Sequence, residues 1–229
     1  MIVNEDTMDV IEFFLPEKYE VLQVTEVGSQ MWGMADLSSD HDIVVIYREK
    51  TRDILKGKPT HPTLPCNHHK WIHGQEYDFS YLEVGHFCHQ LKKGNVNMLW
   101  ALLSPIVTYQ TKEMNHLACY IRNSVHTADI VPSGIGMTES QLADIEKRAA
   151  VRSPEKSVKT AYRTIRFVHD HLVTGQWNFR PVERRVLRVS VQSYIDEVRN
   201  LIAEKEFDSM PKEWIEQWLL DVRLSDLNL

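Results

Sequence analysis

Hydrophobic and polar positions change their period part-way along the chain. Up to about residue 82, short runs rich in β-branched and aromatic residues alternate with turn-forming residues, a pattern typical of strands. The strands predicted there are 19–27, 42–47, 70–73 and 76–81, the last two paired as a hairpin around Gly74. Short helices are predicted at 7–14 and 30–36. Beyond residue 83 the apolar positions recur at helical spacing, which predicts helices at 83–93, 96–103, 111–123, 138–150, 154–174, 183–206 and 211–221.

This change of period divides the chain into a front part that contains strands and an all-helical back part, joined around residues 82–110. The predicted fold class is therefore α+β. The helix 154–174 is the best marked, because Ser153 and Pro154 stand at its start and Gly175 just past its end. We place a domain boundary at residue 110, which gives domains of 1–110 and 111–229.

The composition is that of an ordinary soluble globular protein, with 43% hydrophobic and 25% charged residues in 229. A net charge of −6 argues against extensive non-specific binding to DNA and leaves room for a local basic patch. Three widely spaced cysteines do not indicate a disulfide framework. Because neither a signal peptide nor a membrane span is recognisable, we expect a cytoplasmic protein without a membrane partner.

Two aspartates stand at the start of the strand 42–47. Asp40 and Asp42 are two residues apart, so their carboxylates project to the same side of an extended chain. Two ionised carboxylates that close repel unless a cation lies between them, and oxygen ligands suit Mg²⁺ bound together with substrate phosphates. Gly28 and Ser29 end the preceding strand, where a glycine lets the backbone approach phosphate and a hydroxyl adds a donor. Either pair alone is typical of a turn; both in this order favour a functional site.

The segment GSQMWGMADLSSDHDIVV, residues 28–45, resembles the signature of the polymerase-β-type nucleotidyltransferase superfamily, which is Gly-Ser, a spacer and Asp-x-Asp. Gly33 and Ser39 fall where a predicted nucleotidyltransferase family within that superfamily has a second glycine and a serine. The segments LKKGNVN (91–97) and KTAYRTIRFVHDHLVTG (159–175) also resemble that family. Two positions depart from the pattern: His41 stands where an apolar residue is usual, and Trp100 where an acidic residue is expected.

The resemblance implies a polymerase-β-like mixed sheet with flanking helices, followed by a C-terminal helical domain. It implies that a nucleoside monophosphate is moved from a nucleoside triphosphate to an acceptor hydroxyl, with release of pyrophosphate, a reaction of EC 2.7.7 type. Two Mg²⁺ ions, or Mn²⁺, are expected on Asp40, Asp42 and a third carboxylate. Gly28, Ser29 and Ser39 are the residues expected at the nucleotide.

Asp78 is the first candidate for the third carboxylate. Tyr77, Phe79 and Tyr81 alternate to one face of their strand, so Asp78 points to the opposite face. Glu76 lies on the same face as Asp78 by parity and remains the alternative. An exposed strand acid without a ligand is the structural alternative, and the resemblance favours a ligand.

The helix 154–174 carries a basic stripe. Lys156, Lys159, Arg163 and Arg166 fall together at 100° per residue, apart from the apolar stripe of the same helix. Cations without interleaved acids suggest a phosphate-binding face, although a solvated basic face has the same pattern. In related nucleotidyltransferases a helical-domain lysine reaches the triphosphate. The resemblance thus favours Lys159 as a nucleotide-binding residue, with Arg163 and Arg166 as its neighbours.

A histidine-rich loop occupies residues 61–73. Its zinc-type ligands are His61, Cys66, His68, His69 and His73. Their spacing matches no tight structural-zinc pattern, and a second group, His86, Cys88 and His89, is equally mixed. We interpret 61–73 as a histidine-bearing loop on the acceptor side rather than a zinc site.

The leading hypothesis is a metal-dependent nucleotidyltransferase whose acceptor is an RNA end, a protein hydroxyl or a small molecule. One alternative is a catalytically silent, nucleotide-binding regulatory module; another is a toxin–antitoxin component that acts on a partner protein. The presence of both Asp40 and Asp42 argues against a binding-only protein, since a mutually repelling pair has no use there. The base preference and the oligomeric state leave no mark in the sequence.

Overall fold

The structure, a computed structural model, describes residues 19–37, 39–58, 68–123, 127–147, 153–182, 186–203 and 208–227. The helix predicted at 7–14 lies outside these ranges. The described strands are β1 (Tyr19–Glu26), β2 (His41–Glu49), β3 (His68–Ile72), β4 (Gln75–Glu83) and β5 (Val107–Gln110). The described helices are α2 (Gly28–Met31), α3 (Thr51–Leu55), α4 (Val84–Leu91), α5 (Val96–Leu103), α6 (Lys112–Asn123), α7 (Thr127–Lys147), α8 (Pro154–Thr174), α9 (Arg188–Ala203) and α10 (Lys212–Ser225).

The strands form one mixed sheet in the order β3-β4-β2-β1-β5. Strands β2 and β4 are parallel, whereas the other neighbouring pairs are antiparallel. The parallel pairing places Asp42 directly opposite Asp78. A mixed sheet followed by helices confirms the predicted α+β fold class.

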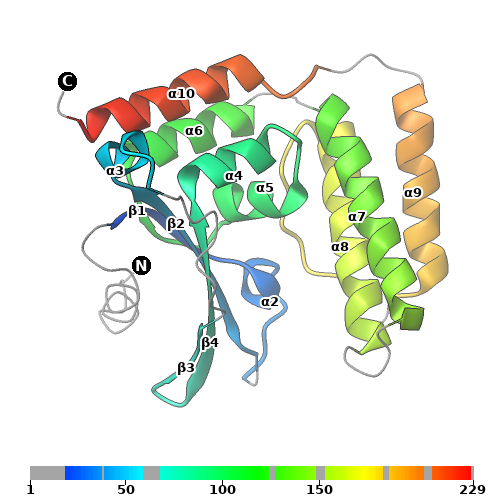
Figure 1. Ribbon diagram of the computed structural model, residues 1–229. Coiled ribbons are helices and arrows are strands. Elements are labelled where there is room, and N and C mark those ends of the chain that lie inside the picture. The colour runs from blue at the N-terminus through cyan, green and yellow to red at the C-terminus, as the bar shows by residue number, and fades with distance from the viewer. Residues whose placement is uncertain are drawn as a thin grey trace.

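The two faces of the sheet pack differently. On one face Tyr77, Phe79 and Tyr81 stack at successive ring-centroid distances of 6.1 and 6.4 Å, as their alternation predicted. On the other face Leu22 and Ile46 join a large apolar core that extends through the helices. Figure 1 shows α4, α5, α6 and α10 beside one end of the sheet, while α7, α8 and α9 form a separate bundle.

Helix α8 has the predicted bounds, and its ends carry the predicted signals. Pro154 occupies its first turn, and Gly175 ends it with a left-handed φ of 70°. Helix α7 begins at Thr127 rather than at the predicted residue 138, because Pro132 and two glycines obscured its periodicity. Gly134 has a packing reason to be small: a Cβ there would lie 2.5 Å from Val168 Cγ2 on α8.

Helix α10 returns from the helical part to the sheet. Arg223 forms a 2.5 Å ion pair with Glu83 and donates a hydrogen bond to the carbonyl oxygen of Glu49 at 3.0 Å. The apolar core is continuous from Leu22 on β1 to Val222 on α10. The boundary at residue 110 stays a prediction, and the last helix of the back part packs on the front part.

The hairpin prediction is confirmed, and its turn places His73 and Gly74 at φ values of 50° and 79°. Helix α5 also has its predicted bounds. Helix α2 begins at Gly28 rather than at residue 30, because the positive φ of Gly28 turns the chain from β1 directly into the helix. The short elements α3 and β5 had no signal strong enough to predict them. In the described part of the chain, no helix combines the length and apolar character that crossing a membrane requires.

Candidate active site

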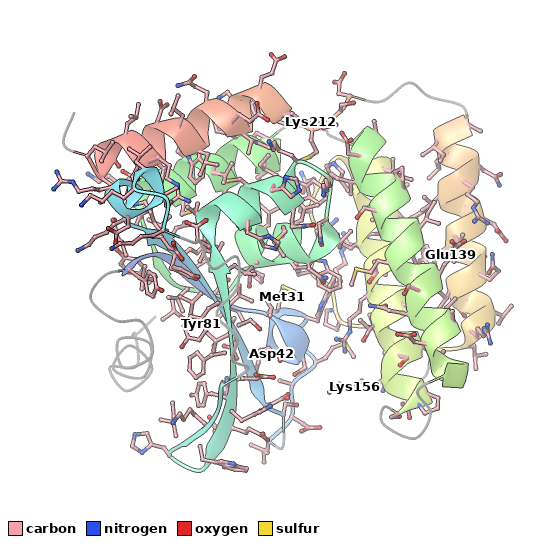
Figure 2. The ribbon with its side chains drawn as sticks, in the orientation of Figure 1. Met31, Asp42, Tyr81, Glu139, Lys156 and Lys212 are labelled. Carbon is pink, nitrogen blue, oxygen red and sulfur yellow. The ribbon has the colours of Figure 1, made fainter. Side chains whose placement is uncertain are left out.

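A cavity of about 700 Å³ lies between the N-terminal end of β2, which carries Asp42, and helix α8. In Figure 2 Asp42 lies on the sheet and Lys156 on the facing end of α8. The predicted site residues that line the cavity are Gly28, Ser29, Ser39, Asp40, Asp42, Lys159 and Arg163. Residues far apart in the sequence thus meet here, with Asp40 and Asp42 on one wall and the cations of α8, together with Glu155, on the other.

Gly28 packs directly against the carboxylate of Asp42. The backbone N–H of Val27 donates a 2.8 Å hydrogen bond to the carbonyl oxygen of Asp42, which brings the start of α2 over β2. A Cβ at residue 28 would lie 1.8 Å from Asp42 Oδ2, far inside van der Waals contact. The φ of Gly28 is 63°, which side chains disfavour as well. The glycine of the Gly-Ser pair is therefore required by the carboxylate it covers.

The carboxylates of the site disturb one another. Burial, together with the charges of Asp40 and Asp78, raises the pKa of Asp42 to about 6, and Lys156 opposes this effect. A carboxylate that resists ionisation in this way gains most from a nearby cation. The donor set therefore fits a hard divalent ion such as Mg²⁺. Among the described residues, no group of three or more histidine, cysteine or acidic side chains is arranged to hold a metal ion by itself.

Asp78 and Glu76 occupy different depths of the same face. Asp78 is level with Asp42 across the β2–β4 pairing, and its Oδ1 atom is buried without a hydrogen-bond partner. Glu76 lines the cavity nearer the end of the hairpin, and its Oε1 lies 3.4 Å from His69 Nδ1. Asp78 thus lies beside Asp42 and has a buried oxygen without a hydrogen-bond partner, whereas Glu76, and not Asp78, is among the residues that line the cavity.

The basic wall of the cavity comes from α8. Lys156 and Lys159 line it, and Lys159 forms a 2.8 Å ion pair with Glu155, so acids are interleaved with this stripe. Arg163 has a buried Nε atom without a hydrogen-bond partner, and burial lowers the pKa of its guanidinium despite the nearby charge of Asp42. An unsatisfied buried N–H donor beside a cavity is a position that an anionic ligand can complete.

Arg166 lies apart from the other three cations. It donates a 3.1 Å hydrogen bond to the carbonyl oxygen of Pro181 and lies 3.9 Å from Asp170. It is not one of the residues that line the cavity. The sequence-based grouping of Arg166 with the nucleotide-binding residues is therefore not supported by its position, because α8 turns this side chain toward the segment that follows it.

Two further donors in the cavity are buried and unsatisfied. Ser29 Oγ and Trp100 Nε1 lack hydrogen-bond partners, and Trp100 is only 9% exposed. Ser39 differs, since its hydroxyl bonds to Asp36 and receives that residue's backbone N–H at 2.9 Å. Ser29 and Trp100 are thus free to contact a ligand, whereas Ser39 stabilises the loop before β2.

An aromatic cluster fixes the two walls of the cavity relative to each other. Trp32, just after α2, packs edge-on against Trp100 of α5 and Phe167 of α8, with ring centroids 5.6 and 6.2 Å away. Trp100 and Phe167 are themselves 6.2 Å apart. The segment after α2, helix α5 and the basic helix α8 are therefore held together by one cluster of aromatic side chains.

His41, the residue between the two aspartates, points away from the cavity. Its ring stacks on Tyr77 at 4.5 Å, and its two nitrogens lie 2.5 Å from Glu26 Oε1 and 2.9 Å from Gln75 Oε1. This side chain fills a polar place on the opposite face of the sheet. The departure at residue 41 thus leaves the carboxylate site untouched.

Residues 59–67, the centre of the histidine-rich loop, lie outside the described residues, and the prediction about zinc there stays untested. Cys88 and Cys119 are free thiols, and burial raises the pKa of Cys88 to about 12. Sequence reasoning missed Trp32 and Trp100 as cavity residues. The mismatch at Trp100 was the signal available, since an aromatic residue replaced an expected acid there.

The family comparison shows the class of protein, which is a nucleotidyltransferase of the DNA polymerase beta type. A family model described as RlaP, the RNA repair pathway DNA polymerase beta family, matches residues 4–220. The chain belongs to that family. A nucleotidyltransferase-like protein from Exiguobacterium sibiricum 255-15 is similar in structure, with 10% sequence identity and a TM-score of 0.37 over 97% of this chain and 73% of the other. The comparison with curated proteins gives no significant match.

Proposed function

We propose that this protein transfers a nucleoside monophosphate from a nucleoside triphosphate to the terminal hydroxyl of an RNA, with release of pyrophosphate. The observation that carries the proposal is the pairing of walls in one cavity. Asp42, whose pKa is raised to about 6 by burial and by the neighbouring carboxylates, faces Lys156, Lys159 and Arg163, whose Nε has no hydrogen-bond partner. A triphosphate and a divalent cation together complement both walls.

The residues of the chain have separate roles in this proposal. Arg163 and Lys159 bind the triphosphate and neutralise the charge that collects on the departing pyrophosphate. Ser29 Oγ, which has no partner within the protein, donates to a phosphate oxygen. Gly28 leaves the space that the Asp42 carboxylate occupies against the start of α2. Most of the rate enhancement then comes from positioning and charge neutralisation.

Asp40, Asp42 and Asp78 would hold the metal, with substrate phosphates supplying the remaining ligands. Bound Mg²⁺ or Mn²⁺ supplies Lewis-acid stabilisation of the reacting phosphate and makes the acceptor hydroxyl a better nucleophile. The carboxylates orient on rigid strands, since β2 and β4 are hydrogen-bonded neighbours in the sheet. Asp40 lies just before β2, so its position depends on the loop that Ser39 and Asp36 stabilise.

An RNA end is favoured as acceptor by the family to which the chain belongs, whose description refers to RNA repair. The net charge of −6 is compatible with a small RNA footprint rather than a long one. The cations facing the carboxylates across the cavity lie on α8, so the basic surface is local.

The test supplies each α-labelled nucleoside triphosphate with Mg²⁺ or Mn²⁺ under four conditions. Three contain single-stranded RNA with a free 3′-hydroxyl, the same RNA with a blocked 3′ end, or a protein extract, and the fourth contains no acceptor. We expect label on the free RNA end and release of pyrophosphate. Asp42→Asn lowers the rate by about 100- to 1,000-fold, because the substitution removes one of the charges that the metal requires.

Asp53→Asn is the matched control, since Asp53 lies on α3 and pairs with Lys58 away from the cavity. Transfer that is undiminished in Asp42→Asn contradicts the assignment of the site. Label on protein contradicts the assignment of the acceptor. The absence of label under all four conditions contradicts the transfer reaction and supports a nucleotide-binding module instead.

A further inference from the structure

The edge strand β3 carries an unusually exposed tryptophan. Trp71 is 72% exposed, more than any other described aromatic side chain. Large aromatic side chains contribute most when they are buried or bound, and an exposed indole is available to a ligand. The neighbouring Ile72 packs instead against the aromatic face of the sheet, so the strand itself is anchored.

Strand register places Trp71 on the same face as the carboxylates. Asp42, Asp78 and His69 form one row across β2, β4 and β3. Trp71 is opposite Glu76, which lines the cavity, and thus belongs to the next row. Residues two apart on a strand are separated by about 7 Å. Trp71 therefore borders the mouth of the cavity, roughly one row beyond the reacting carboxylates.

The position of β3 relative to α8 defines the side from which the acceptor enters. The cations that bind the triphosphate lie on α8, across the cavity from the sheet. Figure 1 shows the β3–β4 hairpin projecting away from the helices. An acceptor that approaches Asp42 and Asp78 from the hairpin side meets Trp71 before it reaches the carboxylates.

We propose that Trp71 is the stacking platform for the terminal base of a single-stranded RNA acceptor. The indole offers a flat surface of the kind on which unpaired bases stack without regard to sequence. Its neighbours on the same face are polar: Glu76 lies opposite it on β4, and His69, two residues earlier on β3, has its Nδ1 3.4 Å from Glu76 Oε1. A lone aromatic between polar groups suits one base better than a protein partner, which needs a contiguous apolar patch. This inference rests on the proposed function for the identity of the acceptor.

The test measures RNA binding without turnover. Fluorescently labelled single-stranded RNA with a free 3′ end is titrated with protein in the absence of nucleoside triphosphate, and binding is followed by anisotropy. Trp71→Ala weakens binding by about 5- to 100-fold, and Trp71→Phe retains most of the affinity because a phenyl ring still stacks. Fully paired RNA of the same sequence binds more weakly and does not respond to either substitution. Trp71 is exposed, so both variants fold.

Tyr109→Ala is the matched control, because Tyr109 is the next most exposed described aromatic, at 40%, and lies on the opposite edge strand β5. In transfer assays Trp71→Ala raises the KM for RNA and leaves the KM for the nucleoside triphosphate unchanged. RNA binding within twofold of the unaltered protein in Trp71→Ala, or loss of equal size in Tyr109→Ala, overturns the proposal.

The two proposals fail in different ways. Trp71-dependent binding of RNA without any nucleotide transfer removes the proposed reaction and leaves the stacking site. Transfer to RNA that is indifferent to Trp71 leaves the reaction and removes the stacking site. If Trp71→Ala instead abolishes labelling of a protein acceptor, the surface is a protein-binding one and this proposal is wrong.

Discussion

The two faces of the β2–β4 pair show opposite solutions to placing polar groups in a sheet. His41 and Asp42 are consecutive, so they point to opposite faces. On the aromatic face both ring nitrogens of His41 lie beside oxygen acceptors, and the ring stacks on Tyr77. On the cavity face, Gly28 packs directly against the Asp42 carboxylate. Burial and the charges of Asp40 and Asp78 raise the pKa of Asp42 to about 6.

The difference separates structural polar groups from functional ones. A side chain selected for folding has its hydrogen bonds completed within the protein, as His41 does. Around the cavity, four polar atoms lack a hydrogen-bond partner: Ser29 Oγ, Asp78 Oδ1, Trp100 Nε1 and Arg163 Nε. Such groups reduce stability while they stay unsatisfied, and a ligand that bonds to them would remove that cost.

The largest effect on the cavity face is expected from a substitution at Gly28. Gly28→Ala places a Cβ against Asp42 Oδ2, so that the carboxylate must move, and we expect the rate of nucleotide transfer to fall by about 100-fold or more. Gly57→Ala is the control, because Gly57 has a similar φ of 75° and nothing within 4 Å of an added Cβ. Its backbone strain of about 1 kcal/mol leaves the rate intact. Equal losses of rate in the two variants would show that backbone strain, not the carboxylate, is responsible.

The next effect concerns the basic wall. Arg163→Gln removes a guanidinium that has no partner for its Nε, and we expect kcat/KM for the nucleoside triphosphate to fall by about 10- to 100-fold. Arg166→Gln, three residues further along α8, removes a guanidinium already bonded to Pro181 and is expected to leave kcat/KM unchanged. Steady-state kinetics at varied triphosphate concentration distinguish the two. A larger loss in Arg166→Gln would contradict the assignment of the wall.

Much of the site could be predicted because its determinants are local. Asp40 and Asp42 share a strand end, and Lys156, Lys159 and Arg163 share a helix face, so short-range periodicity places them correctly. The fold class followed from the change of period at residue 83. The predicted start of α7 was too late, because Pro132 and Gly134 have low helix propensity. In the structure the small size of Gly134 allows close packing against Val168 on α8.

What the sequence could not provide were relations between distant segments. The pairing of β2 with β4 decides that Asp78, rather than Glu76, is level with Asp42. The path of the chain after α8 decides that Arg166 bonds to Pro181 and does not line the cavity. Trp32 and Trp100 meet in the cavity only through packing of α2 and α5 against α8. Each of these depends on a contact that no short motif specifies.

A smaller effect is expected on the aromatic face. His41→Ala removes the stacking on Tyr77 and both hydrogen bonds, and we expect the free energy of unfolding to fall by about 1–3 kcal/mol. His41→Phe keeps a ring for stacking and should lose less. Chemical denaturation measures both, and nucleotide transfer at low temperature should remain near that of the unaltered protein. Loss of transfer without loss of stability would make His41 a functional residue and remove the contrast with Asp42.

The smallest expected effect is the gain of stability when the crowded acid is neutralised. Because the folded-state pKa of Asp42 is raised to about 6 from an ordinary 3.8, its ionisation opposes folding. The penalty is absent below pH 3.8, grows as the pH rises toward 6, and is complete above 6. In metal-free buffer at pH 7.5, Asp42→Asn should therefore raise the free energy of unfolding by about 1 kcal/mol, after allowance for solvent screening, or Tm by roughly 2–4 °C.

Asp53→Asn is the control of opposite sign, since the hydrogen bond from Lys58 lowers the pKa of Asp53 and its loss cannot stabilise the fold. Added Mg²⁺ should raise the Tm of the unaltered protein more than that of Asp42→Asn, because binding to the folded state alone stabilises it. Thermal denaturation between pH 4 and 8, with and without Mg²⁺, measures both effects. A Tm of Asp42→Asn that is lower at pH 7.5 would mean that the carboxylate is satisfied within the protein, as His41 is, and that the contrast between the two faces is wrong.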